Sequence, residues 1–200
     1  MKKIVLVCML LFTLGAYAQT GYKVGDVVAD FKLKNVNNQF VSLTNYPDAK
    51  GYIIVFTCNT CPVSKAYQDR IEDLNKTYKP KGYPVIAINT NDPIASPGDS
   101  FPKMQELAKQ KNTTYPYLED PDHIYTKLYG AAKTPHTFIV QKTEKGNELM
   151  YYGAIDNDQE NTNPQKETYV ADALELLMKG KKPAVNFTKA VGCTIKWKKN

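Results

Sequence analysis

The chain has 200 residues, of which 26 are Lys or Arg and 20 are Asp or Glu, so its formal net charge is +6. This length suffices for one domain with a hydrophobic core and is short for two. The basic residues form neither an arginine cluster nor a stripe along a predicted helix, which argues against nucleic acid as a partner.

The first 18 residues predict a cleaved secretory signal. Lys2 and Lys3 precede an apolar run that begins at Ile4, and Ala16 and Ala18 have the spacing that signal peptidase requires. The apolar run is shorter than the ~20 residues needed to cross a bilayer, which argues against an uncleaved anchor. We therefore expect an exported protein, periplasmic or secreted, whose mature chain begins after Ala18.

The first half of the mature chain predicts two strand and helix units behind a hairpin. Residues 29–46 alternate as two short strands around an Asn-Asn turn, and the apolar run 52–56 is typical of a strand buried on both faces. Apolar residues then recur at steps of three and four from Pro62 to Tyr78, which predicts a helix. Residues 83–89 follow as a second buried strand, and a Pro- and Gly-containing loop comes after it.

The second half predicts further helices and a strand pair. A helix with Pro102 in its first turn is followed by an extended piece at 115–120, and a short helix capped by Asp120 should bury Ile124 and Leu128. The last elements in chain order are two strands at 136–140 and 148–155, joined by a polar turn, and a helix from about Pro164 to Gly180.

This order predicts an α/β domain with a central mixed sheet flanked by helices and an N-terminal β-hairpin, an arrangement that resembles the thioredoxin fold. The expected organisation is a signal at 1–18, one domain at 19–180, and a basic tail at 181–200. The lysines concentrated in that tail predict a solvated segment.

Three cysteines remain once Cys8 leaves with the signal, so at least one thiol is unpaired or intermolecular. Cys58 and Cys61 stand at Cys-x-x-Cys spacing between a buried strand and a helix, the arrangement of thiol-disulfide chemistry, because a helix N-terminus stabilises a thiolate. A structural disulfide in the loop and half of a zinc site are the alternatives. The further ligands available to zinc are Cys193, His123 and His136.

Four motifs, "TCNTCP", "TNDP", "TPHTFIV" and "GCTIKW", together resemble the redoxin branch of the thioredoxin superfamily. Within that branch the chain is similar to the peroxiredoxin-like group, related to alkyl hydroperoxide reductase and thiol-specific antioxidant proteins. The resemblance runs from about Tyr22 to the end of the chain. It implies a thioredoxin-like fold and a redox-active disulfide between Cys58 and Cys61.

Proline placement selects the nucleophile of this pair. Pro62 suits the first position of a helix, where its missing N–H needs no partner, and this makes Cys61 the N-cap residue. The stretch "FTCNTCPVSKA" also resembles the active site of cytochrome-maturation thioredoxins at Phe56, Cys61, Pro62 and Lys65. We therefore predict Cys61 as the nucleophile and Cys58 as its partner in the catalytic pair.

The same resemblance assigns Thr134 and Pro135 to substrate binding. Thr134-Pro135 precedes a strand as the cis-proline of thioredoxin-like folds does, which implies a cis bond that turns the Thr134 backbone toward the cysteines. Substrate peptide would pair with that backbone. Cys193 in the tail has two interpretations, a second resolving thiol that reaches the active site or a buried structural cysteine.

The predicted activity is that of an exported thiol-disulfide oxidoreductase without a cofactor or metal. Its partners would be protein or small-molecule thiol and disulfide substrates and a membrane or periplasmic electron donor. One alternative is copper delivery, with His136 as the distant ligand. The other is weak peroxide reduction, against which stand the absence of a threonine three residues before Cys61 and the presence of a single arginine, Arg70.

Overall fold

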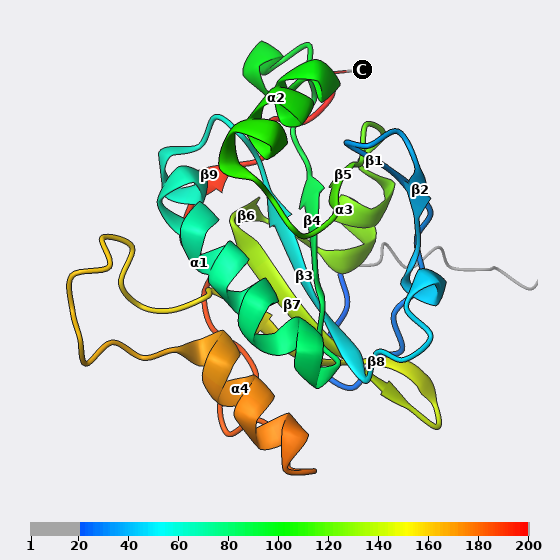
Figure 1. Ribbon diagram of the computed structural model, residues 1–200, viewed down its shortest axis with the longest axis vertical. Coiled ribbons are helices and arrows are strands. Elements are labelled where there is room, and N and C mark those ends of the chain that lie inside the picture. The colour runs from blue at the N-terminus through cyan, green and yellow to red at the C-terminus, as the bar shows by residue number, and fades with distance from the viewer. Residues whose placement is uncertain (1–20, 200) are drawn as a thin grey trace, which may run out of the picture.

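The computed structural model describes residues 21–199, and the predicted signal at 1–18 lies outside the described residues. The described strands form a seven-stranded sheet in the order β2-β1-β5-β4-β3-β7-β8 and a separate two-stranded sheet, β6-β9 (Figure 1). No helix among residues 21–199 is long and apolar enough to cross a membrane.

The strands are β1 (Leu33–Asn35), β2 (Phe40–Val41), β3 (Gly51–Thr57), β4 (Val85–Asn89), β5 (Tyr117–Glu119), β6 (Lys133–Thr134), β7 (His136–Thr143), β8 (Gly146–Gly153) and β9 (Cys193–Thr194). The helices are α1 (Pro62–Tyr78), α2 (Phe101–Lys111), α3 (Ile124–Tyr129) and α4 (Tyr169–Met178). Short 3-10 turns are η1 (Leu43–Asn45), η2 (Lys79–Lys81) and η3 (Pro97–Asp99).

The sheet is mixed, as the order of predicted elements required. Strand β4 runs parallel to both β3 and β5, whereas β7 runs antiparallel to β3 and to β8. The N-terminal hairpin is present, because β1 and β2 pair antiparallel and β1 joins the edge of β5. These pairings confirm the predicted fold class.

Helices cover both faces of the sheet because successive side chains of a strand point to opposite sides. Ile53 and Val55 of β3 pack with α1 and α4, whereas Ile54 and Phe56 pack with the N-terminal segment and with Tyr129 of α3. Figure 1 shows α1 crossing the front of the sheet, with α4 beside it and α3 behind. Helix α1 follows the carboxyl end of the central strand β3, after the loop that carries Cys58 and Cys61.

The short helix α3 differs from the sequence prediction in its buried face. Ile124 is 59% exposed and Leu128 is half-buried, whereas Thr126 and Tyr129 are buried. The reason is the later start of the helix, which begins at Ile124 and not directly after Asp120. The N-cap residue is therefore His123 and not Asp120 as predicted, although the Asp120 carboxylate accepts hydrogen bonds from the Ile124 and Thr126 N–H groups at 3.1 and 2.7 Å.

The last helix is also shorter than predicted. It begins at Tyr169, and not near Pro164, while the predicted inward residues Val170, Ala173 and Leu174 are buried. Residues 164 and 165 form a turn and residues 166–168 are irregular, and the Asn157 carboxamide oxygen accepts the backbone N–H of Glu167 at 3.0 Å.

Candidate active site

The loop between β3 and α1 carries Cys58 and Cys61 and is held by a buried carboxylate. Asp99 Oδ1 accepts the backbone N–H groups of Asn59 and Thr60 at 2.5 and 3.3 Å, and Asp99 Oδ2 accepts the Thr60 hydroxyl at 2.7 Å. Asp99 follows the Pro-Gly of a segment that the sequence indicated only as a loop. Its role in holding the cysteine loop was not foreseen.

Cys61 is the N-cap residue of α1, and Pro62 is the first residue of the helix. The sulfur of Cys61 accepts the N–H of Ser64 at 3.5 Å, and the Cys61 carbonyl accepts the N–H of Lys65 at 3.0 Å. This position places the sulfur against the partial positive charge of the helix N-terminus, which favours a thiolate when the sulfur is reduced.

The sulfur bonded to Cys61 is that of Cys193, and not that of Cys58 as the sequence predicted. The two bonded residues are 132 positions apart in the sequence, with Cα atoms 5.9 Å apart. The physical reason is the position of β9, whose pairing with β6 sets Cys193 opposite Thr134 and next to the start of α1. Figure 1 shows β9 lying by the N-terminal end of α1.

Cys58 carries a free, buried thiol. Its sulfur lies 3.3 Å from the Thr134 hydroxyl, and its S–H donates to the Ser64 hydroxyl at 3.9 Å. Two neutral hydroxyls therefore contact this sulfur, whereas the helix N-terminus contacts that of Cys61. The geometry gives the two cysteines of the Cys-x-x-Cys sequence different electrostatic surroundings.

Thr134 connects all three cysteines of the described chain. The Thr134-Pro135 bond is cis, as predicted. The Thr134 carbonyl oxygen lies 3.2 Å from the Cys61 sulfur, its hydroxyl contacts Cys58, and its backbone pairs with Cys193. The backbone that was assigned to substrate peptide is thus occupied by a segment of this chain.

That segment, residues 186–199, is called the C-terminal arm below. Most residues of this arm are exposed, as a solvated tail would be, but the arm is docked on the domain, because Ile195 is buried and the backbone N–H of Asp92 donates to the Lys196 carbonyl at 2.7 Å. The ring of Trp197 packs on that of His123, with centroids 4.9 Å apart. The alternation of Cys193, Ile195 and Trp197 in "GCTIKW" is a strand-like signal that was available in the sequence.

The two histidines are buried within the fold. His136 Nδ1 accepts the N–H of Ala132 at 3.3 Å, and burial lowers the pKa of His136 to about 4, so the ring is neutral near pH 7. His123 accepts the N–H of Lys198 on Nε2 at 3.0 Å, and burial lowers its pKa as well. Among residues 21–199, no group of three or more His, Cys, Asp or Glu side chains is arranged to hold a metal ion.

Arg70 is engaged away from the cysteines. Its Nη1 donates to both oxygens of Asp156, at 2.8 and 2.7 Å, and its Nη2 donates to the Gln159 carbonyl at 2.6 Å. The guanidinium also stacks on the ring of Tyr67 at 3.7 Å. This arginine therefore tethers the segment before α4 to α1.

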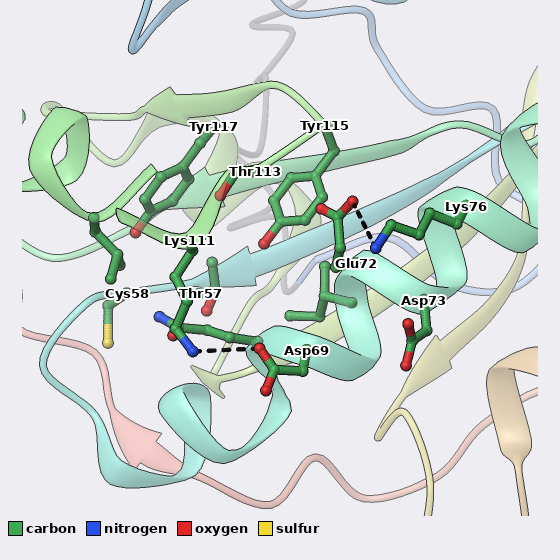
Figure 2. Close-up of a pocket in the computed structure, with 13 residues that line it drawn as sticks. Thr57, Cys58, Asp69, Glu72, Asp73, Lys76, Lys111, Thr113, Tyr115 and Tyr117 are labelled. Atoms are coloured by element: carbon green, nitrogen blue, oxygen red, sulfur yellow. Dashed lines mark hydrogen bonds and ion pairs between the residues drawn. The ribbon is translucent and has the colours of Figure 1, made fainter. Parts of the chain in front are cut away.

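A cavity of about 210 Å³ borders Cys58 between α1, α2 and β5 (Figure 2). Figure 2 shows Cys58 at one end and the carboxylates of Asp69 and Glu72 along the α1 side, where they pair with Lys111 and Lys76 at 3.3 and 3.7 Å. Cys61 does not line this cavity. The cavity therefore lies behind the cysteine loop and does not open onto the predicted nucleophile.

Comparison with known families and proteins identifies the family and several relatives of this chain. The model of a family described as the AhpC/TSA family matches residues 24–146. Thiol-disulfide oxidoreductase ResA of Oceanobacillus iheyensis is 25% identical over 141 residues, which cover 68% of this chain and 69% of the relative.

Solved structures extend the similarity beyond the region of the family match. An uncharacterized conserved protein from Geobacillus kaustophilus superposes with a TM-score of 0.80 and 31% identity over 89% of this chain and 94% of its own. A hypothetical protein of Sinorhizobium meliloti 1021 reaches 0.81 with 26% identity, over 90% and 97%. A putative thiol:disulfide interchange protein DsbE from Chlorobium tepidum, with a TM-score of 0.53 and 21% identity over 65% and 84%, shares the fold. The fold is thioredoxin-like.

Proposed function

Because the chain belongs to the AhpC/TSA family, we propose that it is an exported thiol-disulfide oxidoreductase in which Cys61 is the nucleophile. The observation that carries the proposal is the position of Cys61 at the N-cap of α1, where its sulfur accepts the Ser64 N–H and is already part of a disulfide. The names of the ResA relatives support the same activity.

The proposed reaction begins with attack of the Cys61 thiolate on one sulfur of a substrate disulfide. The attack forms a mixed disulfide with Cys61 and releases the other substrate sulfur as a thiolate. A second cysteine of the protein then attacks the Cys61 sulfur and releases the remaining substrate thiolate. The substrate gains two electrons and two protons, and the protein is left with a disulfide that a dithiol donor must reduce.

Within the Cys-x-x-Cys sequence, Cys58 is the candidate partner of Cys61, whereas the disulfide in the structure joins Cys61 to Cys193. The Cys58 thiol is free and shares contacts with Thr134 and Ser64, the two residues that also contact the Cys61 sulfur. Thiol-disulfide exchange between the neighbouring sulfurs of Cys58 and Cys61 needs no cofactor, because one thiolate attacks the other sulfur directly.

The proposed location is periplasmic or extracellular, on the basis of the predicted signal at residues 1–18. There the substrates would be disulfides of proteins or small molecules, and the electron donor would be a membrane-bound or periplasmic dithiol. Oxidised thiols persist in such compartments, which is consistent with a disulfide at the active site.

Exchange is favoured over the two alternatives by the environment of the side chains each would need. Copper delivery would need the His136 ring beside both thiolates, but no group of three His, Cys, Asp or Glu side chains that could hold a metal forms among residues 21–199, and His136 packs against Phe138. Peroxide reduction would need a guanidinium near the thiolate, whereas the donors of Arg70 bind Asp156 and the backbone beyond it.

The experiment that tests the proposal is reduction of insulin with dithiothreitol as the donor. We expect the protein to accelerate the reduction and Cys61→Ser to return it to the rate of dithiothreitol alone. Absence of acceleration by freshly reduced, folded protein would contradict the proposal.

Brief alkylation of reduced protein at mildly acidic pH tests the choice of nucleophile. We expect mass spectrometry to find the label first on Cys61, because thiols at helix N-termini have lowered pKa values. A label found mainly on Cys58 would show that the conventional thioredoxin order of the two cysteines applies.

A further inference from the structure

We propose that Cys193 is a third redox-active cysteine, the resolving thiol for the mixed disulfide on Cys61, and that the C-terminal arm delivers it. This assignment rests on the proposed thiol-disulfide exchange and deepens it. The direct observation is the Cys61–Cys193 disulfide, which is the product that such a resolving step leaves.

The arm is fitted to the active site by its backbone. Gly192 packs so closely on the Thr134 carbonyl that a Cβ atom at this position would overlap it, so that only glycine is accommodated. Directly after it, Cys193 pairs with Thr134 in an antiparallel register. The arm therefore presents a cysteine to Cys61 in the way that an extended substrate peptide would.

Contacts on both sides of Cys193 hold the arm without the disulfide. On one side the Thr188 hydroxyl accepts the Ala154 N–H at 2.9 Å, and its backbone N–H donates to the Tyr152 carbonyl at 3.1 Å. On the other side Ile195 is buried and the N–H of Lys196 donates to the Asn91 side chain at 2.9 Å. A thiol anchored in this way attacks as an intramolecular group with a high effective concentration.

The position of the Cys61–Cys193 bond argues against a purely structural role for this disulfide. A structural disulfide is most stable where no thiolate can reach it, but here one of its sulfurs is at a helix N-terminus and a free thiol, that of Cys58, contacts the same threonine. The Cys61 sulfur is also a good leaving group, because the helix N-terminus stabilises the thiolate that departs.

The cycle balances with two external reagents, a substrate disulfide that is reduced and a dithiol donor that is oxidised to a disulfide. The Cys61 thiolate attacks a substrate disulfide, the Cys193 thiolate then attacks the Cys61 sulfur, and both substrate sulfurs leave as thiols while Cys61 and Cys193 become a disulfide. A dithiol donor then attacks the sulfur of Cys193, which is half-buried whereas Cys58 and Cys61 are buried. This attack expels the Cys61 thiolate, and the second thiol of the donor frees Cys193.

The test uses 5,5′-dithiobis(2-nitrobenzoate) as a small disulfide on the reduced mature chain, from residue 19 onward, which lacks Cys8. Attack by Cys61 releases one thionitrobenzoate group and leaves the other on the protein, and only a resolving thiol releases the second. Cys58→Ser should release both groups and yield a Cys61–Cys193 cross-link in peptide maps. In Cys58→Ser/Cys193→Ser the adduct should persist roughly hundredfold longer, because no intramolecular thiol remains.

Retention of the adduct in Cys58→Ser would overturn the proposal and assign resolution to Cys58. Peptide mapping of acid-quenched wild-type protein gives the same decision without a variant, because the first cross-link formed must include Cys193. Cys61→Ser serves as the control for adducts on other cysteines. The assay needs no protein substrate, so it can show that Cys193 is the resolving thiol even if the protein does not reduce insulin. If the protein reduces insulin but the adduct on Cys61 persists in Cys58→Ser, the proposed function stands and the role of Cys193 is refuted.

Discussion

The Cys61–Cys193 bond should make an unusually large contribution to stability because of the length of chain that it closes. In the chain-entropy description, a cross-link between residues 132 positions apart raises the free energy of unfolding by about 5 kcal/mol near room temperature. A bond between Cys58 and Cys61 would close only the Cys-x-x-Cys loop, and the same relation gives about 2 kcal/mol. The two pairings therefore differ by about 3 kcal/mol.

Urea unfolding of the oxidised protein, with and without dithiothreitol, measures this contribution. We expect reduction to lower the free energy of unfolding of the wild-type chain by about 5 kcal/mol, seen as a lower midpoint. Cys58→Ser is the matched control, and its loss on reduction should be as large. Cys193→Ser should lose at most about 2 kcal/mol, because only the short loop can then be closed.

A particular pattern of results would refute this reasoning. If reduction costs the wild-type protein about 2 kcal/mol or less, and Cys58→Ser removes the effect altogether, then the oxidised protein carries the Cys58–Cys61 bond in solution. Equal losses in wild type and Cys193→Ser would lead to the same conclusion.

Three further predictions concern buried groups around the site. Asp99→Ala should lower the free energy of unfolding by about 2–4 kcal/mol in urea titrations, since it leaves several buried donors without an acceptor, and a change below about 0.5 kcal/mol would contradict that role. Burial lowers the pKa of His136 from 6.5 to about 4, so on acidification the unfolded state takes up the proton before the folded state does. The free energy of unfolding should therefore fall by up to about 3 kcal/mol as the pH drops from 6.5 through 4. His136→Gln should remove this part of the acid dependence. Ile195→Ala should weaken docking of the arm by about 2 kcal/mol and slow re-formation of the long-range disulfide by up to about thirtyfold, as followed by quenched peptide mapping, whereas exposed Val191→Ala should not.

Local chemistry explains why the sequence alone could determine much of this protein. The alternation and apolar runs of the strands, the helical repeat after Pro62, and the restricted backbone of proline each act within a few residues. These local rules predicted α1 from Pro62 to Tyr78, the N-cap position of Cys61 and the order of strands and helices. The mixed sheet followed from that order.

The partner of Cys61 was decided only by the tertiary structure. Proximity in sequence favoured Cys58, but the docking of the arm on β6 sets Cys193 beside Cys61 across 132 positions. This contact depends on the burial of Ile195 and on hydrogen bonds of the arm backbone, such as that of Lys196 with Asn91. The partners in these contacts are far apart in the sequence, so no short stretch of residues predicts them. The same holds for Asp99, whose carboxylate holds a loop about 40 residues earlier in the chain. The local sequence determines the electrostatic position of the nucleophile, and the long-range packing determines which thiol reaches it, because intramolecular exchange depends on contact in space and not on spacing in the chain.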